Sequence, residues 1–291
     1  MDVRGDMSKR KNPTNRPVNC SDRGDKKGRR KPASGSRNAE SPLPAGGPPL
    51  LYGKHAVFNA LANPQRRIQR LLLTQEARDS QQDDISEALD KGEHGNIEIS
   101  CLDRRSLEER LPPGAVHQGM ALEAEPLPTK HIEDIIKQCK NDPKAAIVIL
   151  DQATDPHNIG AILRSAAAFG AAAVVVQDRN APDITGTMAK AASGALERVA
   201  LVRTTNLARA MEKAKAAGFW CIGLDGTATQ TIAEADLDGR IALVLGAEGS
   251  GLRRLTRENC DLLVKVPMTG AVESLNLSNA AAIALYEKTR S

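Results

Sequence analysis

Residues 146–170 read AIVILDQATDPHNIGAILRSAAAFG, an apolar run followed by a polar loop and a helix-like segment that ends at a glycine. Two later stretches also place an apolar run beside a loop rich in Gly, Asn or Ser: IALVLGAEGSGLRR from Ile241 and LLVKVPMTGAVESLNLSNAAAIALYE from Leu262. Open α/β sheets bind ligands at the carboxyl ends of their parallel strands. The three stretches therefore predict one site, with candidate residues Asn158, Arg164, Glu248, Ser274 and Asn276.

The surrounding sequence alternates strand-like and helix-like segments. Helices are expected at 159–169 and at 206–217, the second ending before Gly218. Alternating strands and helices are typical of a largely parallel sheet. The alanine-rich helices, including 166–168 and 280–282, predict close helix packing. The expected strands are 146–150, 173–176, 198–202, 219–223, 241–245 and 262–266.

A smaller α/β unit is expected before this sheet. Val57, Ala60 and Leu61 have helical spacing, and Asn63-Pro64 separates them from a strand at 68–73. Further segments are a helix at 81–91, a strand at 97–101, a short helix at 106–111, a final strand at 116–122, a linking stretch at 123–130 and a helix at 131–140. The predicted organisation is an arm at 1–48, a small domain at 49–126, a linker at 127–143 and a larger domain at 144–291.

Charge is unevenly distributed along the chain. Residues 1–48 hold 12 Lys or Arg against 5 Asp or Glu, a net charge of +7, whereas the whole chain carries +4. With few large apolar side chains, this segment is predicted to be a disordered basic arm. It would either attract a polyanion or aid solubility.

Several protein classes are disfavoured. Five scattered cysteines without a CxxC pair argue against a disulfide framework or a zinc cluster. No run of 18 apolar residues exists and the N-terminus is charged, so a cytoplasmic protein is expected. The glycines at 246, 249 and 251 follow a late strand in reversed spacing, which fits neither a dinucleotide fingerprint nor a P-loop.

The three stretches resemble, in order and spacing, the signature motifs of the SpoU (TrmH) family of RNA ribose 2′-O-methyltransferases, within the SPOUT superfamily. The segment GKHAVFNALANPQRRIQRLLLT from Gly53 is similar to the small RNA-binding substrate domain of many members. The resemblance implies a deep trefoil knot, S-adenosylmethionine (AdoMet) as methyl donor, and a homodimer. By motif position, the cofactor-binding residues would be Leu224, Gly246, Val266, Ser274 and Leu275.

Methyl transfer to oxygen needs no metal, and the sequence shows no His, Cys and carboxylate cluster to hold one. The resemblance places Arg164 beside the acceptor. A charged guanidinium has no lone pair with which to accept a proton, so we interpret Arg164 as a clamp on an RNA phosphate. Asn158 would orient the ribose hydroxyl or Arg164, or simply cap a helix before Ile159.

Glu248 would orient Asn158 or Arg164, or be a solvated loop carboxylate. Ser274 or Asn276 is expected to cap the alanine-rich helix as well as to position substrate. Lys54 is a candidate RNA contact in the small domain.

Aromatic residues make up 2% of the chain, so recognition of RNA would depend on phosphates, arginine and shape. The resemblance favours a guanosine of large-subunit (23S-type) ribosomal RNA as the substrate, with a transfer-RNA ribose as the alternative. A non-catalytic RNA-binding or ribosome-assembly factor and a nicotinamide-dependent oxidoreductase remain alternatives from other classes.

Overall fold

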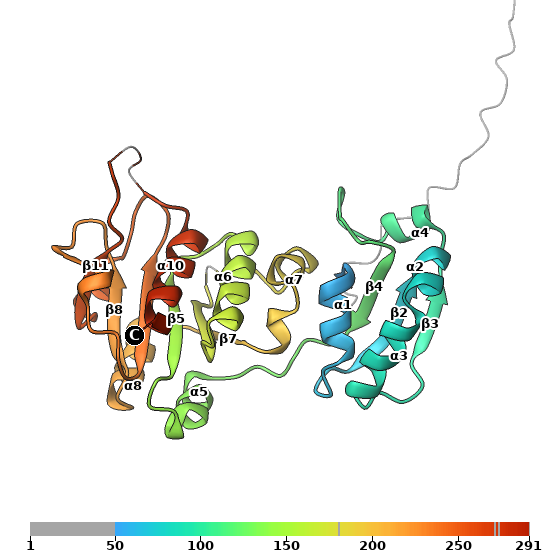
Figure 1. The fold of residues 1–291 in the computed structure, drawn as a ribbon, viewed down its shortest axis with the longest axis horizontal. Helices are drawn as coiled ribbons and strands as arrows, with labels where there is room; N and C mark the ends of the chain where they lie inside the picture. The colour runs from blue at the N-terminus through green and yellow to red at the C-terminus, as the bar shows by residue number, and fades with distance from the viewer. Residues whose placement is uncertain (1–49, 180, 271, 273, 291) are drawn as a thin grey trace, which may run out of the picture. The chain divides into compact units, whose positions relative to one another are not determined.

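The structure is a computed structural model that describes residues 50–179, 181–270, 272 and 274–290. The predicted arm, 1–48, lies outside the described residues. Two sheets are formed, one of four strands and one of seven. We call the residues around the first sheet, 50–124, the four-stranded part, and those around the second, 132–290, the seven-stranded part (Figure 1).

The four-stranded part has the strand order β1-β4-β2-β3, in which β4 runs antiparallel to β1 and β2, and β3 runs parallel to β2. Its apolar face is covered by α1 and α3, through residues such as Val57 and Ile85. Its elements are β1 (Leu50–Tyr52), α1 (Lys54–Leu61), β2 (Ile68–Leu73), α2 (Gln75–Ser80), α3 (Gln82–Lys91), β3 (Glu98–Cys101), α4 (Arg104–Glu108) and β4 (Met120–Ala124).

Four details of this part differ from the sequence predictions. Strand β1 and helix α2 were not predicted. Strand β4 begins at Met120 rather than at residue 116, because Gln118 and Gly119 have φ values of 54° and 76°, which interrupt an extended chain. Helix α4 begins earlier than predicted, because the Asp103 carboxylate accepts a hydrogen bond from the Ser106 N–H at 3.0 Å and caps it.

The seven-stranded part confirms the predicted largely parallel α/β sheet. All of its pairings are parallel, in the order β7-β6-β5-β10-β8-β11-β9. The trefoil knot stays a prediction. The strands are β5 (Ala146–Asp151), β6 (Ala173–Gln177), β7 (Ala200–Thr204), β8 (Trp220–Leu224), β9 (Gln230–Thr231), β10 (Ile241–Gly246) and β11 (Leu262–Lys265). The helices are α5 (Ile132–Gln138), α6 (Pro156–Ala168), α7 (Gly186–Ala192), α8 (Leu207–Ala216), α9 (Arg254–Glu258) and α10 (Leu277–Arg290), with 3-10 turns at Cys139–Asn141, Ala195–Glu197 and Ile232–Glu234.

Both faces of the large sheet are buried. In β5, Val148 and Leu150 belong to the core under α6, α7 and α10, whereas Ile147 and Ile149 belong to the core under α5 and α8 (Figure 1). Alternate residues of a strand point to opposite faces. A strand buried on both faces therefore reads as a continuous apolar run, as residues 146–150 do.

Alanine and glycine allow the helices on the first face to approach closely. A Cβ added to Gly160 of α6 would lie 2.6 Å from both the Ala191 Cβ and the Met188 carbonyl oxygen of α7. Ala166 of α6 and Ala281 of α10 are both fully buried. The expected close packing of the alanine-rich helices is confirmed.

Helix α6 begins at Pro156, and the Asp155 side chain caps it by accepting from the His157 N–H. Asn158 is therefore inside the first turn, and its interpretation as the N-cap before Ile159 was wrong. Strand β7 begins two residues later than predicted, because Ala195–Glu197 forms a 3-10 turn. Helix α8 follows Asn206, whose side chain caps it, and lies within the predicted range 206–217. Helices α7 and α9 and strand β9 were not predicted.

Candidate active site

A cavity of about 370 Å³ lies at the carboxyl ends of β8, β10 and β11. Strand order reverses here, since β6 and β7 continue from β5 on one side of β10 and β8 and β11 lie on the other. Such a reversal is the usual ligand position in an open α/β sheet. All five residues predicted to contact a cofactor line this cavity: Leu224, Gly246, Val266, Ser274 and Leu275.

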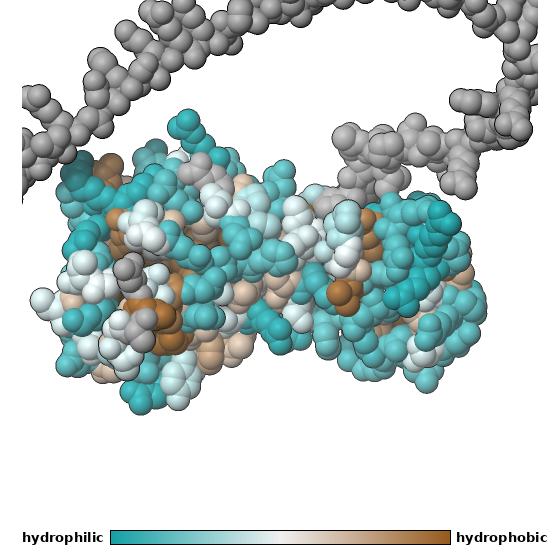
Figure 2. All heavy atoms as spheres, turned by 90° about the horizontal axis from the view of Figure 1, so that it is seen from above, coloured by the Kyte–Doolittle hydropathy of each residue, from teal (hydrophilic) through white to brown (hydrophobic). Residues whose placement is uncertain are grey.

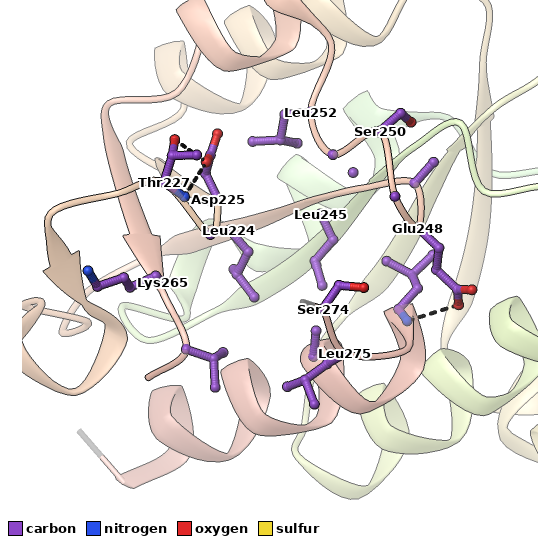
Figure 3. A pocket seen from close by; sticks show the side chains of 18 of the residues that line it. Leu224, Asp225, Thr227, Leu245, Glu248, Ser250, Leu252, Lys265, Ser274 and Leu275 are labelled. Carbon is purple, nitrogen blue, oxygen red and sulfur yellow. Dashed lines mark hydrogen bonds between the residues drawn. The ribbon is translucent and has the colours of Figure 1, made fainter. Parts of the chain in front are cut away.

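The cavity has an apolar middle and polar ends. Figure 3 shows Leu224, Leu245 and Leu275 in the middle of the view, with Asp225 and Thr227 at one end and Glu248 at the other. Figure 2 shows hydrophobic atoms gathered on a largely hydrophilic face of the seven-stranded part. An apolar pocket with a few placed polar groups is typical of a small-molecule site.

The loop after β10 folds back over the strand end. A bridge pairs Ala247 with Gly251, and a Cβ added to Gly246 would lie 2.0 Å from the Gly251 carbonyl carbon. No side chain fits at that position. By contrast, a Cβ at Gly226 or Gly249 would meet nothing within 4 Å. This part of the wall consequently offers backbone groups and open space to a ligand.

Beside the cavity, Glu248 joins two of the other predicted residues. Its Oε1 accepts hydrogen bonds from the Asn158 Nδ2 at 3.0 Å, the Asn276 Nδ2 at 2.8 Å and the Leu277 N–H at 3.1 Å. The Asn276 Nδ2 also donates to the Asn158 Oδ1 at 3.0 Å. One residue from each of the three sequence stretches thus meets in a single network.

Asn276 has a second function at the start of α10. Its Oδ1 accepts from the Ser278 N–H at 2.8 Å, which is the geometry of a helix cap. Ser274 instead lies on the cavity wall. Of the two residues proposed as the cap of this helix, Asn276 is the one that takes this position.

Arg164 is not part of the network. It is exposed on α6, six residues after Asn158, which is about 9 Å farther along a helix. Within the described ranges of the chain, no hydrogen bond or ion pair involves its guanidinium. Lys54 lies in the four-stranded part, where its Nζ is 3.3 Å from the Asp84 Oδ2 and 5.5 Å from the centre of the Phe58 ring.

Sequence reasoning missed the polar groups at the other end of the cavity. The Asp225 Oδ1 accepts from the Thr227 N–H at 2.8 Å and the Thr227 hydroxyl at 2.6 Å, and the Arg257 Nη1 is 2.7 Å from the Asp225 Oδ2. Burial alone would raise the pKa of Asp225. The hydrogen bonds from Thr227 and the charge of Arg257 outweigh burial, so the pKa lies below its ordinary value. Asp225 directly follows the last residue of β8, the position that could have revealed it.

A buried carboxylate holds the loop that follows β10, residues 247–252, which we call the glycine loop. Asp151, at the carboxyl end of β5, is fully buried. It accepts from the Arg253 N–H at 3.0 Å and from the Arg253 Nε at 2.7 Å. Arg253 also donates to the Gln177 Oε1 at 2.8 Å. Arg253 directly precedes α9 and is bonded to β5 and β6 through these two residues.

Two family models match the chain. The model of the SpoU rRNA methylase family matches residues 145–286, and the model of the RNA 2′-O ribose methyltransferase substrate-binding domain matches residues 50–130. A curated relative from Vibrio vulnificus, 23S rRNA (guanosine-2′-O-)-methyltransferase RlmB, is 42% identical over 243 residues, which cover 83% of this chain and 96% of the relative. The chain belongs to the SpoU rRNA methylase family.

Other SpoU relatives agree with this assignment. The RlmB protein of Escherichia coli K12 is 39% identical over 241 residues, covering 83% of this chain and 98% of the relative. Among solved structures, the SpoU methyltransferase AviRb from Streptomyces viridochromogenes, crystallised with AdoMet, is 26% identical with a TM-score of 0.67, covering 83% of this chain and 89% of AviRb. The SpoU fold thus extends over both sheets.

Two further observations concern the part of the chain that the structure describes. It contains no group of three or more His, Cys, Asp or Glu side chains that could hold a metal ion. Nor does any of its helices have the length and apolar character needed to cross a membrane.

Proposed function

We propose that this protein transfers a methyl group from AdoMet to the ribose 2′-hydroxyl of a guanosine in 23S-type ribosomal RNA, acting in the cytoplasm. The observation that carries the proposal is the network of Asn158, Glu248 and Asn276 beside the cavity. The curated relatives support the substrate, since two of them are named as 23S rRNA guanosine methyltransferases.

The cavity fits AdoMet. Its leucines suit the adenine ring, while the backbone around Gly246 and Gly249 suits the polar groups of the ligand. Leu224, Val266, Ser274 and Leu275 would complete the wall. When bound, AdoMet supplies an electrophilic methyl group on a sulfonium sulfur.

The network of polar residues would position the acceptor. Asn158 uses its Nδ2 toward Glu248 and its Oδ1 toward Asn276, which fixes the orientation of its amide. The amide keeps a second N–H with which it can bind the ribose oxygen. The described residues give the Glu248 Oε2 no hydrogen bond, so this oxygen can accept one from the ribose hydroxyl. Positioning of this kind contributes a large part of catalysis when no metal is used.

Arg164 would act on the RNA phosphate beside the acceptor. Its guanidinium is exposed and has no ion-pair partner in the described residues, so it can form a bidentate contact with phosphate. From the same position, the positive charge of Arg164 would also stabilise the alkoxide that develops on the ribose oxygen. Lys54 would contribute a phosphate contact from the four-stranded part.

We further propose a homodimer in which Arg164 reaches the network of the partner subunit. Two features support it. Arg164 lies away from Asn158 within its own chain, and Tyr286 of α10 is 53% exposed while its ring packs edge-on against Phe169, 6.1 Å away. Phe169 directly follows the last residue of α6, and Arg164 lies within this helix. Tyr286 is an exposed aromatic residue on α10, and residues of this kind are common in dimer interfaces.

The test is methyl transfer itself. Purified protein is incubated with labelled AdoMet and separate pools of ribosomal and transfer RNA, and alkali-resistant ribose positions are mapped. One labelled guanosine in 23S rRNA is the expected result. Label only in transfer RNA would make a transfer-RNA ribose the substrate. If neither pool is labelled despite AdoMet binding, the same assay is repeated on ribosomal precursor particles, and no transfer there would favour a non-catalytic factor.

A further inference from the structure

The four-stranded part contains a second cavity, separate from the site above. Its volume is about 280 Å³, and its lining residues include Thr74, Ser80, Gln81, Arg104, His117 and Gln118. We propose that this cavity receives one unstacked nucleobase of the RNA, recognised through an N–H donor on its edge. The inference rests on the proposed function, because it assumes that RNA is the substrate.

The first observation is an unpaired acceptor. The Gln81 Oε1 is buried and accepts no hydrogen bond from the described residues. A buried carbonyl oxygen without a donor is costly, and a ligand N–H that reached it would remove that cost. The same amide carries N–H donors on its Nε2. A donor beside an acceptor is the pattern with which glutamine pairs with the edge of a base.

The second observation concerns the loop at Gln118 and Gly119, which also lines the cavity and is held in place by hydrogen bonds. Gln118 has a φ of 54°, a strained value for a residue other than glycine, and Gly119 follows at 76°. The Gly119 N–H donates to the His117 Nδ1 at 3.1 Å, and the Gly119 carbonyl accepts from the Thr74 N–H at 2.8 Å. A Cβ at Gly119 would lie 2.6 Å from the Thr74 Oγ1. The wall is therefore preformed, which lowers the entropy cost of binding.

The surroundings favour a base over other ligands. Ligand pockets commonly have volumes of about 300–1,000 Å³, and this cavity lies just below that range, which suits a ligand no larger than a single heterocycle. Arg104 has a side chain that is 79% exposed, and its planar guanidinium can stack on a base. The described residues that line the cavity include no Phe, Tyr or Trp, so Arg104 and His117 are the side chains there that can stack on a base.

The cavity also adjoins the predicted RNA contact. The Gln118 Oε1 accepts from the backbone N–H of Lys54 at 3.1 Å, so the strained loop separates the cavity from Lys54. Lys54 is thus next to the cavity wall in the fold, and its Nζ, 3.3 Å from the Asp84 Oδ2, is the candidate partner for a phosphate of the bound nucleotide. Phosphate contacts position RNA and base contacts specify it. The two groups together would let the four-stranded part select a particular unpaired nucleotide.

The test compares the wild type with Gln81→Leu, which removes the acceptor, and with Gln82→Leu at the exposed neighbouring residue as control. AdoMet-saturated enzyme is bound to 23S rRNA fragments, and base edges are probed with dimethyl sulfate and a carbodiimide. The wild type and the control should protect one unpaired base. Gln81→Leu should leave it reactive and bind RNA about tenfold more weakly.

Circular dichroism melting establishes that each variant folds, and Ser80→Phe, which fills the cavity from an exposed residue, should give the same loss. If the wild type methylates RNA but both variants bind and protect it normally, the inference is overturned and the proposed function stands. If the wild type binds AdoMet but methylates no ribosomal RNA, the proposed function itself fails.

Discussion

Glu248 and Asn158 are 90 residues apart in the sequence, and a hydrogen bond of 3.0 Å joins their side chains. The bond links the loop after β10 to the first turn of α6. Asn276 bonds to both residues, so the orientation of each amide depends on the same carboxylate oxygen. The network fixes the orientation of the Asn158 amide and leaves one of its N–H groups for the acceptor, which makes Asn158 the most direct test of the site.

Asn158→Ala should lower the methylation rate at saturating substrates by about a hundredfold, because the acceptor loses its orienting amide. AdoMet affinity, measured by calorimetry, should change by less than about twofold, since Asn158 does not line the cavity. His157→Ala, at the exposed neighbouring residue, serves as the control and should retain the rate. A fully active Asn158→Ala enzyme would remove this residue from the mechanism.

Arg164→Ala and Glu248→Ala should each inactivate the homodimer. If the site is shared between subunits, mixed dimers should regain about a quarter to half of the activity, because one of their two sites then has both native residues. The measurement uses differently tagged subunits purified as heterodimers. Absence of rescue in verified heterodimers would place both residues in one chain's site.

Asp151→Asn should weaken the anchor of the glycine loop. The charge-assisted hydrogen bonds to Arg253 are lost or weakened, so the free energy of unfolding in urea should fall by about 2 kcal/mol. AdoMet affinity should fall as well, because the loop forms the cavity wall. Asp178→Asn is the control: the Asp178 carboxylate is exposed where it pairs with Arg203, so its loss should cost less than about 1 kcal/mol. If both variants lost the same free energy of unfolding, the buried Asp151–Arg253 pair would contribute no more to stability than an exposed carboxylate does.

Asp225→Asn should alter the pH dependence of stability. The pKa of Asp225 is lower in the folded protein than in the unfolded chain, so its carboxylate stabilises the fold above about pH 4. That contribution is lost as pH falls through the folded pKa. In AdoMet-free protein, the variant should be less stable than the wild type at pH 7, and the difference should shrink below about pH 4. Thr227→Val should give a smaller effect of the same sign, whereas a pH-independent difference would assign the effect to packing.

The sequence predicted the large sheet because its central strands are buried on both faces. Residues 146–150 and 241–245 are continuous apolar runs, and both are strands. Helix α7 was missed because Gly, Thr and Ala dominate its seven residues and give no clear apolar period. Strand β9 has only two residues, too few for a pattern.

The site was predicted less completely than the fold. Asn158 could equally have been a helix cap, and the outcome depended on Asp155 taking that position three residues earlier. Asp151 follows an apolar run without any sign of its partner, since Arg253 lies 102 residues away. Pairings of this kind depend on the order of strands in the sheet, which local patterns do not contain.

Gly246 has a practical consequence for inhibition of this enzyme. No larger residue fits at this position, since an added Cβ would lie 2.0 Å from the Gly251 carbonyl carbon. A compound that binds the backbone at this position would contact a surface that single substitutions cannot reshape without displacing the whole loop. Drug resistance would have to arise elsewhere on the cavity wall.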